Sequence, residues 1–218
     1  MKQKEILVSQ VVRFIVDVGE YGHRSLRSPV PLIDGLREKY GFVEVPQTVA
    51  ELDFTKGVKF AQGYYKGRII NKLQIFNNGV LCEANEDTSL SDEFLGELLA
   101  WAEQEHSLPV KETGVKAYLS QLVVVSPVDI GAAFSKFSAI GVMLADALRN
   151  YGHQHREYRV SGIKMHYDSM IEPPPRAPEF TFERRAGELF STKEFFTSAP
   201  VRTSDHLAIL EALEKVFC

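Results

Sequence analysis

Cysteine is scarce in this chain of 218 residues, which has only Cys82 and Cys218. Closely spaced pairs of cysteines are typical of zinc sites and redox motifs, and the chain contains no such pair. Cys82 stands in an apolar segment, where a single thiol usually behaves as a small buried hydrophobe. We therefore expect a fold that its hydrophobic core stabilises, without disulfides or structural metal.

Common sequence motifs of catalysis are also missing. The chain has no Gly-x-Ser-x-Gly motif, so the sharp turn that carries an α/β-hydrolase nucleophile is not indicated. Gly57, Gly63 and Gly67 fall within a predicted hairpin and open no helix whose backbone amides could hold phosphate. His23 begins a single His-x-Ser sequence, whereas a two-histidine phosphoesterase needs a matched pair. These absences favour a protein that is not an enzyme.

Long hydrophobic runs and an excess of positive charge are absent as well. The longest apolar stretch, from Ile140 to Leu148, is interrupted by Gly141 and Asp146 and is too short to span a bilayer. The first five residues do not begin a secretory signal peptide. We therefore expect a cytoplasmic protein without membrane contact. The formal net charge of −4 argues against a general nucleic-acid binder, which normally carries a strong positive excess.

The composition is that of an ordinary globular protein, with 44% hydrophobic and 25% charged residues. Alternating and β-branched residues predict strands, and apolar residues at helical spacing predict helices. The expected strands cover 12–18, 58–65, 68–76, 80–84, 118–125, 158–168 and 180–186. A short helix is expected at 31–40, and three main helices follow Ser89 or Ser91, span 132–151 and span 203–217.

This order of elements predicts an α+β fold, with mostly antiparallel sheet and about three main helices packed on one side. A single compact unit over residues 1–218 is expected, and two similar βββα-like halves, 1–110 and 111–218, are the alternative organisation. The helix at 132–151 is predicted to be the most buried, because Gly141 and several alanines would allow close approach of its neighbours. Its apolar stripe contains Phe137, Ile140, Leu144, Leu148 and Tyr151.

Histidine and arginine side chains in the second half form a first candidate site. His166 and Asp168 would share one face of a predicted strand, because side chains two apart point the same way. Arginine guanidinium groups match carboxylate or phosphate, which indicates an anion pocket. Pairing of Glu183 with arginine across an exposed sheet is the alternative explanation of the same residues. The candidate pocket contains His153, His155, His166, Asp168, Glu183, Arg184 and Arg185.

A basic and aromatic hairpin forms a second candidate surface. The pattern is typical of nucleic-acid binding, but it also fits an edge hairpin that lysines protect from aggregation. Glu83 to Glu105 follows it with eight acidic residues and no lysine or arginine. The candidate interaction surface contains Lys59, Tyr64, Tyr65, Lys66, Arg68 and Lys72.

The leading hypothesis is a non-catalytic cytoplasmic protein-interaction or assembly subunit, present as a homo-oligomer or in a heteromeric complex. The alternative is an enzyme that binds a small ligand or a metal in the His/Arg pocket. A third hypothesis is a nucleic-acid accessory protein that uses the hairpin. No cofactor is expected, and nucleic acid is not the favoured partner.

Overall fold

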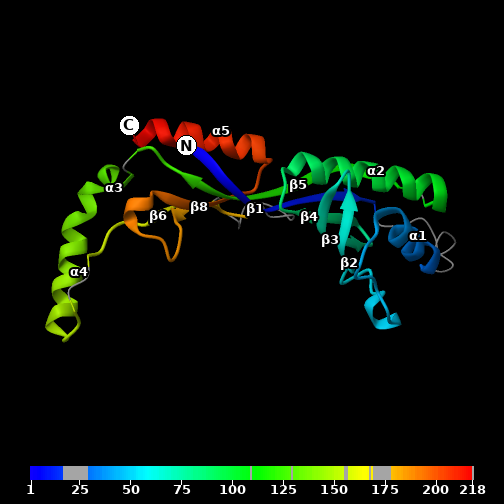
Figure 1. The fold of residues 1–218 in the computed structure, drawn as a ribbon, viewed down its shortest axis with the longest axis horizontal. Coiled ribbons are helices and arrows are strands. Elements are labelled where there is room, and N and C mark those ends of the chain that lie inside the picture. Colours follow the sequence, from blue (N-terminus) through cyan, green and yellow to red (C-terminus); the bar gives the residue numbers. More distant parts are fainter. Residues whose placement is uncertain are drawn as a thin grey trace. The chain divides into compact units, whose positions relative to one another are not determined.

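The computed structural model describes residues 1–16, 29–108, 110–128, 130–154, 157–166, 168 and 178–217. Eight strands form one sheet in the order β2-β3-β4-β1-β5-β8-β7-β6 (Figure 1). The pairs β1–β4, β2–β3, β3–β4, β6–β7 and β7–β8 are antiparallel. The strands are β1 (Lys2–Ile15), β2 (Val58–Tyr65), β3 (Arg68–Phe76), β4 (Gly79–Ala84), β5 (Glu112–Val125), β6 (Gly162–Met165), β7 (Phe180–Arg184) and β8 (Glu194–Ala199).

Four helices of 11 to 19 residues accompany these strands in the described part of the chain. The fold is therefore α+β, as the sequence predicts. The four helices are α1 (Val30–Tyr40), α2 (Thr88–His106), α4 (Ser138–Asn150) and α5 (Thr203–Phe217). Shorter helical segments are α3 (Ile130–Ala133), η2 (Val49–Glu51), η3 (Ser135–Phe137) and η4 (Phe190–Thr192). No helix among the described residues is both long and apolar enough to cross a membrane.

The chain divides into two compact units. The larger unit contains 6–121 and 200–203, and the smaller unit contains 1–5, 122–199 and 204–218. The division falls inside β5, whereas the sequence placed an alternative boundary after residue 110. Both units draw on β1 and β5, so neither unit is a continuous half of the chain.

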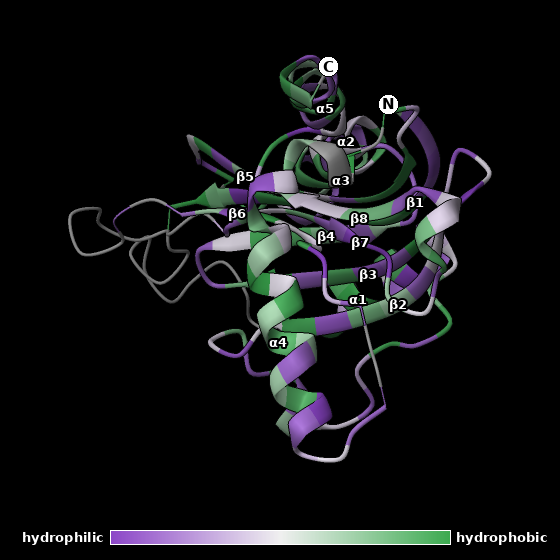
Figure 2. Cartoon of the chain, turned by 90° about the vertical axis from the view of Figure 1, so that its left-hand side faces the viewer, coloured by the Kyte–Doolittle hydropathy of each residue, from purple (hydrophilic) through white to green (hydrophobic). Residues whose placement is uncertain are grey.

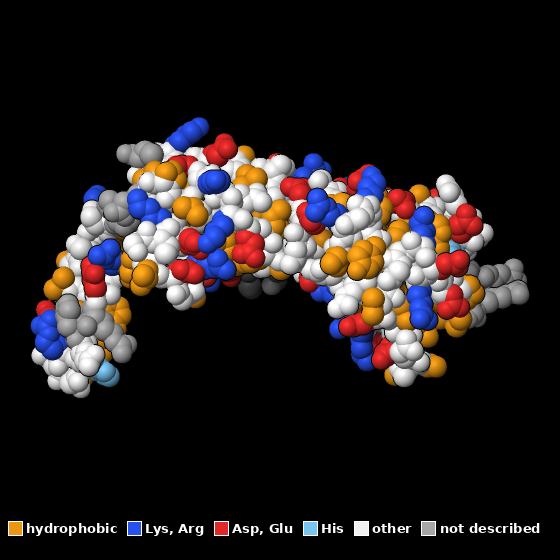
Figure 3. Space-filling view, in the orientation of Figure 1, with side chains coloured by type: hydrophobic (Ala, Val, Ile, Leu, Met, Phe, Trp, Pro, Cys, Tyr) orange, Lys and Arg blue, Asp and Glu red, His pale blue; other side chains and the backbone are white. Residues whose placement is uncertain are grey.

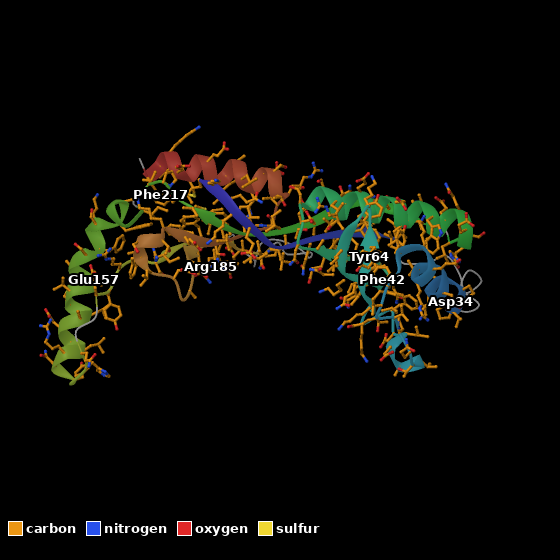
Figure 4. The ribbon with its side chains drawn as sticks, in the orientation of Figure 1. Asp34, Phe42, Tyr64, Glu157, Arg185 and Phe217 are labelled. Atoms are coloured by element: carbon orange, nitrogen blue, oxygen red, sulfur yellow. The ribbon has the colours of Figure 1, made fainter. Side chains whose placement is uncertain are left out.

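The core of the larger unit lies between the sheet and the helices α1 and α2. Tyr40 of α1 packs edge-on against Phe94 of α2, with 5.0 Å between ring centroids. Phe42 packs against Phe60 of β2 and lies over Gly63, where a Cβ atom would be 2.4 Å from the Phe42 ring (Figure 4). Gly63 therefore allows an aromatic side chain to contact the strand backbone directly.

Local signals explain where the elements of the larger unit begin and end. Gly41 ends α1 in the left-handed conformation, with φ 63°, as expected for a helix C-terminus. Asp87, and not Ser89 or Ser91, caps α2, because its carboxylate accepts the backbone N–H of Ser89 at 2.8 Å. Positive φ at Lys66 and Gly67 makes the tight turn between β2 and β3.

In the smaller unit, α5 packs against β7 and β8. Phe182 of β7 stacks on Phe195 of β8 with ring centroids 4.6 Å apart, and Phe182 also lies 6.4 Å from Phe217 of α5. The predicted strand 158–168 is shorter in the structure, because only residues 162–165 pair with β7. The strand β8 is not among the predicted strands, because its residues are nearly all buried and show no apolar–polar alternation.

The helix α4 contradicts the prediction that it would be the most buried helix. Within α4 only Gly141 and Ala145 are buried, while its large apolar residues are largely exposed. Hydrophobic and hydrophilic residues alternate along this helix (Figure 2). The expectation of three main helices packed on one side of a sheet is therefore not confirmed for α4.

Candidate functional site

The two arginines of the first candidate site point in different directions from β7. Arg184 donates hydrogen bonds to the carbonyls of Leu189 and Phe190, the latter at 3.1 Å, and its guanidinium stacks on the Phe190 ring. Arg185 instead pairs with Glu194, with Nη1 and Oε2 3.2 Å apart (Figure 4). Arg184 is the last residue of β7 and Arg185 follows it, and their guanidinium groups have different partners, so the two cations do not share one pocket.

The histidines of the same candidate site lie on exposed segments. His153 follows α4 and is exposed, and His166 is exposed with its Nδ1 atom 3.3 Å from Glu179 Oε1. Asp168 and Glu183 are also exposed. His155 lies outside the described residues. Among the residues that the structure describes, no group of three or more His, Cys, Asp or Glu side chains could hold a metal ion.

Arg184 lies near two other cations. Arg159, Arg184 and Lys193 line a groove of about 390 Å³ in the smaller unit. The guanidinium carbon of Arg159 lies 5.1 Å from the centre of the Phe190 ring, and that of Arg184 lies 4.4 Å from it. Arg159 also pairs with Glu157 at 2.7 Å, so the groove carries a moderate positive excess.

The basic hairpin of the second candidate site is largely neutralised by the acidic segment that follows it. Three of its cations pair with acidic side chains, in the ion pairs Lys66–Glu93, Arg68–Glu86 at 3.3 Å and Lys72–Glu83 at 2.8 Å. The positive run and the negative run of the sequence therefore compensate each other within the larger unit. This pairing weakens the electrostatic attraction that nucleic-acid binding requires.

Lys59 and Lys72 also line a groove of about 630 Å³ beside β2 and β3. Four acidic residues line the same groove, so its charge is mixed and does not favour an anion. These four residues are Glu44, Glu51, Asp53 and Glu83.

The aromatic residues of the hairpin differ in burial. Tyr65 is buried, with its ring 5.3 Å from Phe94, and it is part of the core. Tyr64 is exposed and pairs in register with Ile69, which is also exposed. Hydrophobic side chains gather over β2 and β3 on the visible face of the molecule (Figure 3). This patch is small, and charged residues of the hairpin surround it.

A larger apolar surface lies on α4 and at its two ends. Its members are Phe137, Ile140, Met143, Leu144 and Tyr151, which together we call the α4 stripe. Their exposed fractions are 56%, 54%, 67%, 48% and 76% in that order. Soluble proteins rarely leave several large apolar side chains exposed on one face without a binding role. The α4 stripe is therefore the most conspicuous candidate interaction surface in the described part of the chain.

The spacing of the stripe is that of a seam between two helices. Phe137, Ile140, Leu144 and Tyr151 follow one another at intervals of three, four and seven residues, with Ala147 between the last two. These intervals put all of them on one side of a helix, as the a and d positions of a heptad are. The two charged residues of α4, Asp146 and Arg149, pair with each other at 3.0 Å.

The face of α4 beside the stripe, which carries Gly141 and Ala145, is attached to the smaller unit. A Cβ atom on Gly141 would lie 2.2 Å from the carbonyl oxygen of Tyr158, so the helix and the segment 157–160 are in close backbone contact. Ala145 is buried one turn later, and Val142 borders a groove of about 680 Å³ between the two segments. Phe137 of the α4 stripe also lines this groove, whereas Ile140, Met143, Leu144 and Tyr151 lie outside it.

The sequence contained the stripe but gave no sign of its exposure. An amphipathic helix has the same apolar periodicity whether its own sheet or another molecule covers it. The small residues Gly141 and Ala145 beside the stripe indicated only the face where backbones approach. No model of a known protein family matches the chain, and no curated protein is detectably similar to it.

Proposed function

We propose that the protein is a non-catalytic, cytoplasmic subunit that assembles with protein through the α4 stripe. The observation that carries this proposal is the set of five large apolar side chains exposed on α4 and at its two ends. Burial of one such side chain contributes about 1.5–3 kcal/mol relative to full exposure, so covering the stripe is strongly favourable. A protein surface is the partner that can cover a helix of this length.

The polar chemistry of the described residues supports the same class of function. Arg184 and Arg185 bind different partners, and His153 and His166 lie on exposed segments. Catalysis generally requires a nucleophile, a base and a stabilising group in mutual reach. The histidines and arginines are better explained as hydrated or ion-paired surface groups.

The proposal predicts that the chain forms a stable complex in the cells that make it. The test compares the tagged wild-type chain with Leu144→Glu and with the matched control Val142→Glu, by size-exclusion chromatography of cell extract after cross-linking. Val142 is 59% exposed on the same helix but lies on the groove side. Wild type and control should elute above 24.5 kDa with cross-links on α4, and Leu144→Glu should elute as a monomer. Equal elution of all three chains as monomers would contradict the proposal.

A second candidate function is binding of a small anionic ligand, which the groove of Arg159, Arg184 and Lys193 favours. Guanidinium and ammonium groups near a phenyl ring suit carboxylate or phosphate. Isothermal titration calorimetry with inorganic phosphate tests this function. Binding that is lost in Lys193→Gln but kept in Lys164→Gln, an exposed lysine of β6, would support it. Absence of heat at millimolar phosphate would reject this candidate.

A further inference from the structure

The chemistry of the α4 stripe indicates which molecule covers it. We infer that a second copy of this chain covers it, with stripe against stripe about a two-fold axis. This inference rests on the proposed function and names the partner. A two-fold contact uses the same patch on both copies, so the patch must be complementary to itself.

The charge pattern of α4 satisfies that requirement. The stripe contains no charged side chain, and Asp146 and Arg149 neutralise each other in an ion pair. Two copies therefore meet without repulsion between like charges. The stripe has no charged group that could pair with a highly charged partner. It also lacks the charges by which an interface selects one partner over another.

The exposed area agrees with a dimer of modest affinity. At about 200 Å² for a fully exposed large apolar side chain, the stripe exposes roughly 600 Å² on each copy. Pairing of two stripes would remove roughly 1,200 Å² from water, which is the lower limit of stable interfaces. We therefore expect a dissociation constant on the order of 1–100 µM, because ordering costs offset much of the gain from burial.

The direction of the two helices follows from their dipoles. An antiparallel arrangement opposes the two macrodipoles and is the more stable one. With Leu144 at the two-fold axis, seven residues separate it from both Phe137 and Tyr151. Phe137 of one copy then lies against Tyr151 of the second copy, and the apolar seam is continuous along the helix.

Sedimentation velocity of the purified chain over 1–200 µM tests the inference. Wild type and Val142→Glu should shift from monomer to dimer as concentration rises. Leu144→Glu should remain monomeric, with dimer affinity lowered about 100-fold or more, because two carboxylates would meet at the axis. Circular dichroism should show equal helix content in all three chains, since both replaced side chains are largely exposed. A wild-type chain that stays monomeric at 200 µM overturns the inference.

Disulfide cross-linking tests the geometry in a chain carrying Cys218→Ser, because the other cysteine, Cys82, is buried. Leu144→Cys should form a disulfide-linked dimer on mild oxidation, and Val142→Cys should not. A mixture of Phe137→Cys and Tyr151→Cys chains should cross-link as a heterodimer, while Phe137→Cys alone should not. Equal cross-linking at positions 142 and 144 would overturn the stripe-to-stripe contact.

These outcomes separate the inference from the proposed function. If the purified chain is monomeric but forms a complex in cell extract that depends on the α4 stripe, the partner is not a second copy of this chain. The proposed assembly function is still supported in that case. Monomers in both experiments overturn both. A dimer that Leu144→Glu abolishes in both experiments supports both.

Discussion

Thr197 of β8 and His206 of α5 share a buried hydrogen bond, with Thr197 Oγ1 and His206 Nε2 2.8 Å apart. The Thr197 hydroxyl donates its proton to the Thr181 carbonyl at 2.9 Å. Since a hydroxyl has one proton to donate, it must accept from His206, and Nε2 carries the hydrogen. This chain of bonds joins β7, β8 and α5 in the core of the smaller unit.

Replacing Thr197 with valine should destabilise the smaller unit. The change keeps the shape of the side chain but leaves the Nε2–H of buried His206 without its acceptor, at a cost of about 1–3 kcal/mol. Hydrogen exchange measured by mass spectrometry should show faster exchange in peptides covering β7, β8 and α5.

The matched control is Thr181→Val on the neighbouring strand. Within the described residues the buried Thr181 Oγ1 atom has no hydrogen-bond partner. Its removal should therefore leave the free energy of unfolding unchanged or raise it slightly. Equal losses of protection in both variants would contradict the role assigned to the Thr197 hydroxyl.

Much of the larger unit could be predicted from sequence because its signals are local. Gly41 ends a helix and the Lys66-Gly67 pair makes a turn through their own backbone preferences. The strands predicted at 68–76 and 80–84 leave a turn at Asn77 and Asn78, which the structure has, although neither asparagine has positive φ. By contrast, β8 escaped prediction because its six residues, Glu-Phe-Phe-Thr-Ser-Ala, are nearly all buried and show no apolar–polar alternation.

Asp92 should contribute to the stability of the larger unit through its three partners. Its carboxylate contacts Arg13 at 2.8 Å and Lys116 at 2.9 Å, and the Tyr118 hydroxyl donates to it at 3.3 Å. The Asp92→Asn variant leaves the largely buried Arg13 guanidinium without this charge, at a cost of about 2 kcal/mol. Urea unfolding followed by the fluorescence of Trp101, the only tryptophan, measures the loss.

The stabilisation by Asp92 should also depend on pH. Burial by itself would raise the pKa of Asp92, but the Lys116 hydrogen bond and the Arg13 charge together lower it below its ordinary value. A lowered pKa in the folded state means that the stabilisation is complete at pH 7 and disappears as the pH falls below about 4. The difference in the free energy of unfolding between wild type and Asp92→Asn should therefore become smaller in acid.

Glu93→Gln is the control, because it is the adjacent residue of α2 and its ion pair with Lys66 is exposed. Exposed ion pairs contribute about 0–1 kcal/mol, so this variant should unfold almost as wild type does. If Glu93→Gln lowers the free energy of unfolding as much as Asp92→Asn does, the partial burial of the Asp92 ion pairs does not make them more stabilising than the exposed Lys66–Glu93 pair.

Gly141→Ala should detach α4 from the segment that carries it. Helix propensity alone would favour alanine by about 1 kcal/mol, but the new Cβ atom would lie 2.2 Å from the Tyr158 carbonyl oxygen. We expect faster hydrogen exchange in α4, whereas Asp146→Ala, an exposed change on the same helix, should have little effect. Unchanged exchange in Gly141→Ala would contradict the close packing of α4 on Tyr158.

Four residues of the α4 stripe could be predicted from their spacing, but the membership of Met143 and the exposure of the stripe could not. Leu144 and Ala145 are consecutive in the sequence, and only the fold makes one largely exposed and the other buried. The charge compensation of the hairpin was equally hidden, because Lys66 and Glu93 are brought together by packing of β2 against α2. The residue types indicated an apolar stripe and a charged hairpin, but the exposure of the stripe and the ion pairs of the hairpin depend on three-dimensional packing.

The most direct test of the central claim is the rate at which a thiol on α4 reacts with a small alkylating reagent. Leu144→Cys and Val142→Cys, each in a Cys218→Ser chain, are alkylated in cell extract and after denaturation. If the α4 stripe is an occupied interaction surface, position 144 reacts several-fold more slowly than position 142 in the native extract, and the difference disappears on denaturation. Equal native rates at the two positions would contradict the account.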